Sequence, residues 1–201
     1  MIKAIFTDLG GVCLSNGWDT ATRKKAAKHF KLDSVEMEAR HNMIAGIYEE
    51  GKLSIDVYLD FVVFHKPQEF HRETFIAYMK AQSTPFQDML DLYRAIKAKT
   101  GCRILALSNE GRELADHRIS RFDLPQFIDI FIVSSYVGFR KPDPNIFKIA
   151  LDIAQIKPHE IIYIDDREML AEAAGKMGLK SLWHRSYRTT KSTLARHGLK
   201  G

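Results

Sequence analysis

Residues 2–12 read IKAIFTDLGGV, an apolar run that stops at the carboxylate of Asp8 and continues into two glycines. A short apolar run bounded by turn residues predicts a buried β-strand, which would deliver Asp8 to its carboxyl end. Asp8 alone could simply hydrogen-bond the backbone of the following turn. The paired Gly10 and Gly11 allow a sharp turn and let a ligand approach bare backbone amides. The function of Asp8 therefore depends on what the later segments place beside it.

From residue 85 onwards, expected helices alternate with short apolar runs. The runs cover residues 103–107, 130–133 and 161–164, and residues 180–183 are expected to form a final short strand. Continuous apolar runs separated by helices predict a parallel sheet covered on both faces, so we expect an α/β fold with a doubly wound, Rossmann-like sheet. Ligands of such sheets lie outside the carboxyl ends of the strands. In this chain those ends carry Asp8, Ser108, Ser134 and Asp165.

Residues 16–82 have a different pattern, with apolar side chains at helical spacing and no expected strand. The expected helices cover about residues 20–30, 35–48 and 70–80, with another that Ser54 can cap and Pro67 ends. Methionine and aromatic positions here are expected in the core of a helical bundle. The pattern predicts a small all-helical cap domain of residues 16–82, inserted into a core domain of residues 1–15 and 83–201. A last short helix is expected around residues 190–197.

The bulk composition narrows the class of protein. A chain of 201 residues with 45% hydrophobic content can bury a substantial core. The net charge of +5 comes from scattered Lys and Arg residues, so we expect no nucleic-acid partner. No apolar segment approaches membrane-spanning length, and we expect no membrane partner. Cys13 and Cys102 lack metal-ligand spacing, and Lys3 and Asp8 interrupt the first apolar run, so we expect a cytoplasmic protein without a signal peptide.

Four motifs occur in a fixed order along the chain. Asp8 ends the first strand, Ser108 ends the second in LSN, Lys141 lies in GFRKPDP, and Asp165 and Asp166 end the fourth in YIDD. This ordered set resembles the haloacid dehalogenase (HAD) superfamily, whose members are mostly phosphatases. The motifs of that family are a nucleophilic Asp, a Ser or Thr, a Lys before a helix, and an acidic pair. The resemblance covers essentially the whole chain, including a helical cap inserted after the first motif.

The resemblance implies that Asp8 is the nucleophile and that Ser108 and Lys141 are the other catalytic residues. A carboxylate nucleophile divides phosphoryl transfer into two steps through an aspartyl-phosphate. The charge on the phosphoryl oxygens requires hydrogen-bond donors and cations. The substrate-binding groups expected to supply them are Ser108, Lys141 and the backbone around Leu9, Gly10 and Asn109.

The acidic residues of the motifs suggest a magnesium site. Mg²⁺ is usually bound by one or two carboxylates together with phosphate oxygens of the substrate. We expect Asp8 and Asp166 as direct ligands and Asp165 as a ligand bound directly or through water. The resemblance adds the backbone carbonyl of Gly10. Each side chain alone could be a helix cap or a surface charge, but the four motifs together favour the functional interpretation.

Gly10 departs from the family pattern. Most phosphatases of the superfamily carry an Asp at this position, which protonates the leaving alcohol and then deprotonates the attacking water. General acid–base catalysis is worth roughly 10²–10⁴-fold, so its loss predicts slow turnover more than weak binding. A smaller departure is Leu170, at a position where many relatives carry Asn.

The sequence therefore predicts a HAD-like hydrolase, and within that class a magnesium-dependent phosphatase for a small phosphorylated metabolite held between core and cap. One alternative is a phosphate-binding or regulatory protein with little turnover, which Gly10 supports. Another is carbon–halogen hydrolysis, which needs no metal. Against it, Asp165 and Asp166 would repel Asp8 without a cation. Substrate identity depends on the cap side chains that face the site, for which the candidates include Asn16, Trp18, Arg40 and Tyr48.

Overall fold

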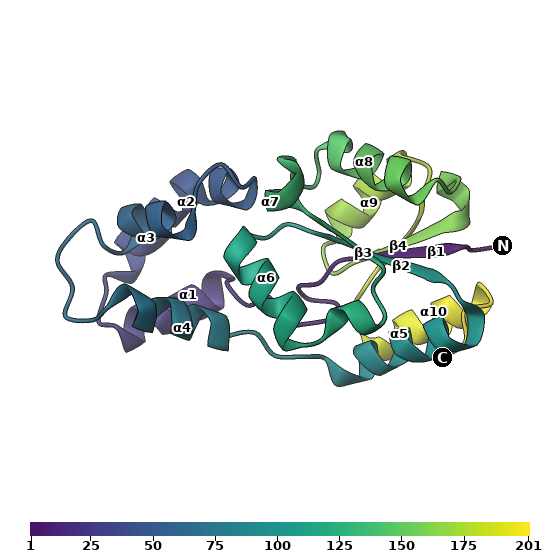
Figure 1. The fold of residues 1–201 in the computed structure, drawn as a ribbon, viewed down its shortest axis with the longest axis horizontal. Coiled ribbons are helices and arrows are strands. Elements are labelled where there is room, and N and C mark those ends of the chain that lie inside the picture. Colours follow the sequence, from purple (N-terminus) through teal and green to yellow (C-terminus); the bar gives the residue numbers. More distant parts are fainter.

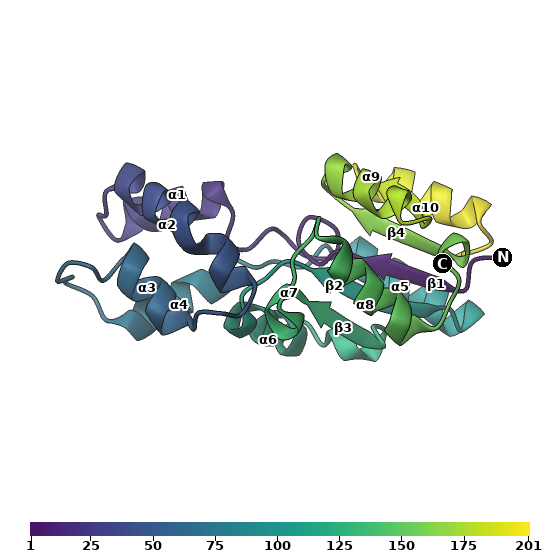
Figure 2. The ribbon, with the colours of Figure 1, turned by 90° about the horizontal axis from the view of Figure 1, so that it is seen from above.

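The computed structural model describes residues 1–201, and at its centre lies a parallel five-stranded sheet in the order β3-β2-β1-β4-β5. Figure 1 and Figure 2 show the sheet in two perpendicular views. The strands are β1 (Ala4–Thr7), β2 (Arg103–Ser108), β3 (Ile130–Val133), β4 (Ile161–Asp165) and β5 (Lys180–Trp183). All neighbouring strands pair in parallel. The predicted doubly wound α/β fold is thus confirmed, and β1 is the central strand.

Helices cover both faces of this sheet (Figure 1). One face is covered by α5 (Gln87–Thr100) and α10 (Tyr187–Arg196), and the other by α8 (Pro144–Ala154) and α9 (Glu168–Lys176). Successive strand residues alternate between the two cores: Ile5 packs in the cluster with α5, and Phe6 packs in the cluster with α8. Both faces are apolar because both are covered, as is usual for a parallel sheet. Helices α6 (Arg112–Arg121) and α7 (Ser134–Val137) and the 3₁₀ turns η1 (Leu124–Gln126) and η2 (Pro158–Glu160) complete this part.

Four further helices lie beyond the carboxyl ends of the strands, at the left of Figure 1. They are α1 (Thr20–His29), α2 (Ser34–Glu49), α3 (Ile55–Val62) and α4 (Arg72–Ala81). Their buried side chains form a separate hydrophobic cluster, to which α6 adds only Leu114. We call these four helices the helical layer. Its packing explains why residues 20–81 read as helical throughout: their apolar side chains are buried against one another.

The helix ends follow local side-chain chemistry. Asp19, Asp33 and Ser54 accept hydrogen bonds from the first backbone amides of α1, α2 and α3. The last helix begins at Tyr187, three residues before the predicted start, because Ser186 caps it. One position of α2 contradicts the bundle-core prediction: Met43 is 70% exposed, because only one stripe of α2 packs inward.

Two chain segments connect the helical layer to the sheet, and they lie side by side. The amide of Ser15 donates to the carbonyl of Thr84 over 2.8 Å, and the amide of Thr84 donates to the hydroxyl of Ser15 over 2.9 Å. Glu113 of α6 adds a contact from the core, since its carboxylate accepts hydrogen bonds from the amide of Ile55 and the hydroxyl of Tyr48. These contacts fix the helical layer above the strand ends. None of the helices has both the length and the apolar character needed to span a bilayer.

Candidate active site

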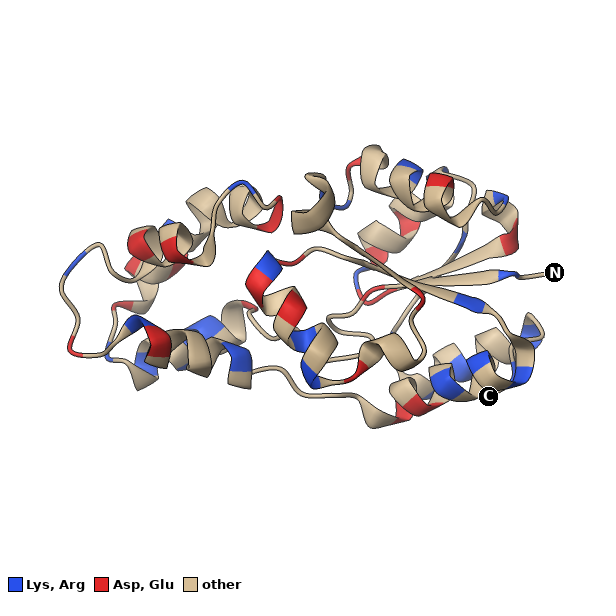
Figure 3. Ribbon diagram, viewed as in Figure 1, with Lys and Arg blue, Asp and Glu red and all other residues tan.

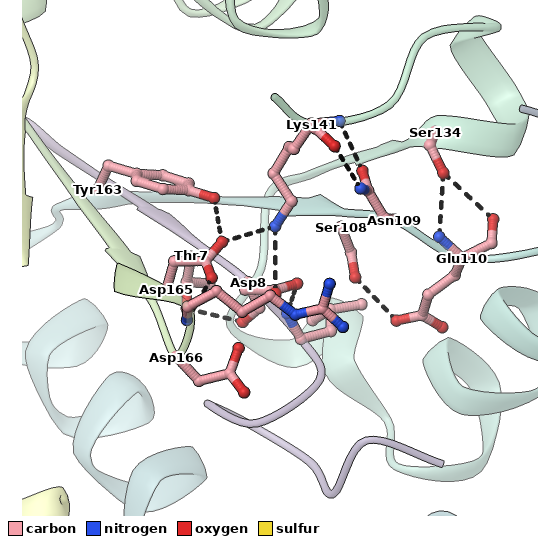
Figure 4. A network of polar contacts seen from close by, with 12 residues as sticks. Thr7, Asp8, Ser108, Asn109, Glu110, Ser134, Lys141, Tyr163, Asp165 and Asp166 are labelled. Carbon is pink, nitrogen blue, oxygen red and sulfur yellow. Dashed lines mark hydrogen bonds and ion pairs between the residues drawn. The ribbon is translucent and has the colours of Figure 1, made fainter. Parts of the chain in front are cut away.

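The predicted site residues meet at the carboxyl ends of the central strands (Figure 4). Asp8 follows β1, Ser108 is the last residue of β2, and Asp165 is the last residue of β4. Because β1 lies between β2 and β4, Asp8 is placed at the centre of this group. Asp166 follows directly, and Lys141 reaches the group from the loop before α8. Figure 3 shows that both the acidic residues and the Lys and Arg residues are spread along the whole ribbon, so overall charge does not single out this group.

Lys141 is buried between two carboxylates. Its Nζ lies 3.1 Å from Asp8 Oδ2 and 2.8 Å from Asp165 Oδ2. Burial alone lowers the pKa of Lys141, but the charges of Asp8 and Asp165 outweigh burial and raise that pKa above its usual value. Lys141 therefore carries a fixed positive charge beside Asp8.

Asn109 holds the backbone that carries Lys141. Its Nδ2 donates to the carbonyl of Lys141, and its Oδ1 accepts from the amide of Lys141, each over 2.8 Å. Sequence reasoning considered only the backbone at Asn109, because the two segments are distant in the chain. The side chain of Asn109 is thus a support for Lys141.

Asp8 is a poorly solvated carboxylate. The amide of Leu9 donates to Asp8 Oδ1 over 2.7 Å. Burial raises the pKa of Asp8 to about 6; Lys141 opposes the shift, and Asp165 and Asp166 add to it. Asp8 is therefore ionised at neutral pH but has little water around it, which suits a nucleophile.

The two adjacent acidic residues have different environments. Asp165 Oδ2 accepts from Lys141 and from the hydroxyl of Tyr163, and its Oδ1 accepts from the amide of Arg167 over 2.8 Å. Asp166 Oδ1 is buried and has no hydrogen-bond partner. Asp166 Oδ2 accepts only from Asn16 Nδ2, over 3.3 Å.

This difference tests whether the residues fit a magnesium ion. Carboxylate oxygens of Asp8, Asp165 and Asp166 lie within 4.8 Å of one another. A buried carboxylate oxygen without a partner is costly unless a cation or donor satisfies it. The free oxygen of Asp166 and the neighbouring Asp8 fit a metal, whereas the oxygens of Asp165 are already engaged. Asp165 fits an outer position better than a direct one.

Different features of the structure restrict a side chain at positions 10 and 11. Gly11 has a φ of +72°, and a Cβ there would lie 2.1 Å from Asp166 Oδ2. Gly10 is not among the glycines with positive φ. A Cβ on Gly10 would instead lie 2.7 Å from Asn16 Oδ1. The amide of Asn16 therefore occupies the space toward which a side chain at position 10 would point.

Ser108 contacts a second charged pair. Its hydroxyl donates to Glu110 Oε1 over 2.9 Å, and Arg118 Nη1 lies 2.8 Å from the same oxygen. Glu110 and Arg118 are both buried, and Glu110 Oε2 has no partner. Sequence reasoning missed this pair, since a charge near a helix start usually indicates a surface cap. Ser134, expected at the strand ends, turns away from Asp8: its hydroxyl donates to the carbonyl of Glu49 and accepts from the amide of Glu110.

A cavity of about 420 Å³ opens between the strand ends and the helical layer. Only six of its 26 lining residues are hydrophobic. The core contributes Asp8, Gly10, Ser108, Asn109 and Lys141, and the helical layer with its linker contributes Asn16, Trp18, Arg23, His41 and Tyr48. Arg40 does not line the cavity, because it pairs with Glu36 over 3.1 Å. A polar cavity of this kind suits a small ligand with many hydrogen-bonding groups.

Comparison with known proteins agrees with this geometry. The chain is 22% identical over 197 residues to a glyceraldehyde 3-phosphate phosphatase of Pyrococcus furiosus, covering 90% of this chain and 80% of the relative. It is 22% identical over 189 residues to a phosphorylated carbohydrates phosphatase of Thermotoga maritima, covering 90% and 84% of the two chains. The fold matches that of a HAD family enzyme of Bacteroides thetaiotaomicron, solved with magnesium and inorganic phosphate. The TM-score of that match is 0.75 at 22% identity, covering 90% of this chain and 93% of the other.

A sequence model of the family described as haloacid dehalogenase-like hydrolase matches residues 2–178. These residues include all four motifs and every strand-end side chain described above, from Asp8 to Asp166. The structure arranges them on the parallel sheet that the resemblance implied. The chain therefore belongs to the haloacid dehalogenase-like hydrolases and is an enzyme of that class.

Proposed function

We propose that this hydrolase is a magnesium-dependent phosphatase that acts on a small phosphate monoester through an aspartyl-phosphate on Asp8. The observation that carries the proposal is the position of Asp8, between the ammonium of Lys141 and the unpartnered oxygen of Asp166. Phosphatases among the relatives and the magnesium and phosphate complex of a structural neighbour support it.

In the first step, the carboxylate of Asp8 attacks phosphorus, and the bond between phosphorus and the ester oxygen breaks. The leaving alkoxide takes a proton from water. The hydroxyl of Ser108 and the ammonium of Lys141 hold the phosphoryl oxygens as their charge develops. In the second step, water attacks the aspartyl-phosphate, releases inorganic phosphate and restores Asp8. Ser108 must turn from Glu110 to the phosphoryl group, which its hydroxyl can do by rotation.

Asp8, Asp166 and the backbone carbonyl of Gly10 would hold magnesium, with Asp165 as an outer ligand. Bound there, the ion supplies positive charge to the phosphoryl oxygens. Asp165 meanwhile holds Lys141 in place through the 2.8 Å contact. The acidic pair thus has two tasks: Asp166 binds the metal and Asp165 positions the lysine.

Because position 10 is a glycine, the site lacks the usual general acid. The side chain nearest to Gly10 is that of Asn16, whose amide cannot act as an acid in its place. Turnover of alkyl phosphates should therefore be slow. We propose residues 16–82 as a cap that holds the alcohol part of the substrate against the core. The polar cavity favours a hydroxylated alcohol, and we infer a phosphorylated carbohydrate as the substrate class.

Turnover of a panel of alkyl, aryl and sugar phosphates, with and without magnesium, tests this proposal. We expect release of inorganic phosphate that requires magnesium and disappears in Asp8→Asn. Phosphate binding without turnover of any ester would instead support a regulatory protein with little activity. Magnesium-independent release of halide from haloacids would support the dehalogenase alternative.

A further inference from the structure

Three aromatic side chains form a polar chain inside the helical layer. The indole Nε1 of Trp18 donates to the hydroxyl of Tyr58 over 2.9 Å, and this hydroxyl lies 2.8 Å from His41 Nδ1. Tyr58 is fully buried, and its ring stacks on that of Tyr48 with centroids 4.5 Å apart. The buried hydroxyl of Tyr58 is thus held between Trp18 and His41.

The chain determines where the proton of His41 sits. An indole nitrogen can only donate, so the hydroxyl of Tyr58 accepts from Trp18 and has one proton left to give. His41 Nδ1 is its remaining partner in the structure. If Nδ1 donated instead, the buried hydroxyl proton of Tyr58 would lack an acceptor, which is unfavourable. His41 Nδ1 therefore accepts, and the proton of the neutral ring lies on Nε2.

The surroundings keep His41 neutral. Burial lowers the pKa of His41 to about 4, and the nearby charge of Arg23 adds to this effect. Arg23 cannot move away, because its Nε and Nη2 each donate to Glu38 over 2.7 Å. Its Nη1 donates to the carbonyl of Trp18 over 2.6 Å. Glu38 opposes the effect of Arg23 on the pKa of His41, so burial is the main cause of the neutral ring, and Arg23 holds the start of the polar chain at Trp18.

The Nε2 atom of His41 is free to meet a ligand. His41 lines the same cavity as Asp8 and Lys141. Its Nε2 has no hydrogen-bond partner in the chain and is not among the buried unpartnered atoms, so it is accessible. The core residues already provide the donors for a phosphoryl group. A donor of the helical layer that faces this cavity is placed to meet the other end of the ligand.

We propose that His41 Nε2–H is a fixed hydrogen-bond donor to an oxygen of the alcohol part of the substrate, and thereby a specificity-determining residue. A neutral donor of this kind selects hydroxyl or carbonyl oxygens rather than a second anion. This inference rests on the proposed phosphatase function for the chemical class of its ligand. The protonation of His41 does not depend on that function and can be tested separately.

Nitrogen-15 NMR of the histidine side chains in the full chain tests the protonation. We expect a neutral His41 with its proton on Nε2 at pH 7, and a mixture of tautomers in Tyr58→Phe. The ring of His29, which is exposed and lies outside the cavity, is the internal reference. A proton on Nδ1, or a charged ring at pH 7, would overturn the inference whatever the enzyme hydrolyses.

Binding of glucose 6-phosphate to Asp8→Asn with magnesium tests the ligand contact without turnover. We expect the His41 Nε2 resonance to move with the sugar phosphate and to stay in place with inorganic phosphate alone. Equal shifts with both ligands, or saturation without any shift at His41, would overturn the contact. Failure of every sugar phosphate in a panel to bind would count against the proposed substrate class.

The KM values of His41 variants for two substrates distinguish a role in specificity from a general folding defect. In His41→Phe we expect the KM for glucose 6-phosphate to rise about 3- to 10-fold, the value of one neutral hydrogen bond. The KM for phenyl phosphate, whose alcohol has no further oxygen, should stay within about twofold. His41→Gln, which keeps a donor near the position of Nε2, should recover part of the loss, and His29→Gln should change neither KM. Equal loss for both substrates would contradict a role in specificity.

Discussion

Lys141 Nζ and Asp8 Oδ2 lie 3.1 Å apart in a site where their side chains are only 1% and 12% exposed. The lysine thus neutralises part of the charge of Asp8 before any phosphate arrives. Even so, burial outweighs the attraction, and the pKa of Asp8 is raised. The carboxylate at the centre of the sheet is held at a cost to stability, as is common at functional sites.

Asp8 is the proposed nucleophile of the site. Asp8→Asn should abolish phosphate release, because the amide has nearly the same shape but is a poor nucleophile. The melting temperature should not fall, since the substitution removes a buried charge without changing packing. Phosphate release and differential scanning calorimetry on the same samples provide the two measurements. Turnover near that of the parent in a folded variant would show that another group attacks phosphorus.

The raised pKa of Asp8 predicts a pH dependence of stability in magnesium-free buffer. Burial raises this pKa from 3.8 to about 6. Between these values the folded protein holds a proton that the unfolded chain has lost, so the free energy of unfolding falls as pH rises through this window. Relative to the parent, Asp8→Asn should gain on the order of 1–3 kcal/mol between pH 4 and 6. Urea unfolding with a chelator at several pH values measures it, and a constant difference would refute the shift.

Substitution by alanine should affect stability at Asp165 and magnesium affinity at Asp166. Asp165→Ala removes one of the two carboxylates beside buried Lys141 and the acceptor of the Tyr163 hydroxyl, so it should lower the free energy of unfolding by roughly 1–3 kcal/mol. Asp166→Ala removes a carboxylate with an unpartnered oxygen, so stability without magnesium should change little, whereas magnesium affinity is lost. Urea unfolding and calorimetric titration distinguish the two effects. Unchanged magnesium affinity in Asp166→Ala would refute its assignment as a ligand.

Gly11 and Gly138 offer a matched pair. Both have positive φ, +72° and +78°, but a Cβ at Gly138 meets nothing within 4 Å. Gly138→Ala should therefore lower the free energy of unfolding only by the backbone cost, about 1–2 kcal/mol. Gly11→Ala should cost more and also weaken magnesium binding, because its Cβ would displace the carboxylate of Asp166. Unfolding and magnesium titration of both variants measure this. Equal costs with unchanged magnesium affinity would mean that Asp166 shifts freely.

Gly10→Asp should restore a general acid. Because Gly10 lacks a positive φ, an Asp there adopts an ordinary backbone conformation. The ratio of alkyl to aryl phosphate turnover should rise by up to roughly 10²-fold, since the alkyl leaving group needs the proton most. Asn16 has to move aside, so Gly10→Asp combined with Asn16→Ala should gain more than Gly10→Asp alone.

Asn16→Ala alone is the control for this comparison, and its ratio of alkyl to aryl turnover should equal that of the parent. Folding of each variant is checked by its melting temperature. If the ratio is unchanged in a folded, active Gly10→Asp variant, the proton comes from another group or from water.

Much of the fold was predictable because β1 to β4 are largely apolar runs that end at, or are followed by, a polar residue. Asp8, Ser108 and Asp165 could be grouped without a structure, since parallel strands end at one edge of the sheet. Position relative to a strand did not decide the direction of a side chain. Ser134, which follows β3 and begins α7, was therefore grouped with them, although it binds Glu110 and Glu49.

The parts that sequence reasoning missed depend on contacts between distant segments. The support of Lys141 by Asn109 and the pairing of Glu110 with Arg118 have no local pattern. The same holds for His41, whose protonation is set by Trp18 and Tyr58 from other elements. Such side chains look like ordinary polar or core residues until the packing of the elements is known.

The central position of β1 also determines when the site can exist during synthesis. Ala4 begins β1 near the start of the chain, yet it pairs with Arg103 on one side and Ile161 on the other. Pairings between such distant segments form late, whereas a helical layer built from local contacts can form early. A nascent chain that ends before β4 lacks both a neighbour of β1 and the acidic pair. Hydrolytic activity should therefore appear on the ribosome only after β4 and the acidic pair have emerged, so that a nascent chain without them lacks the complete strand-end site.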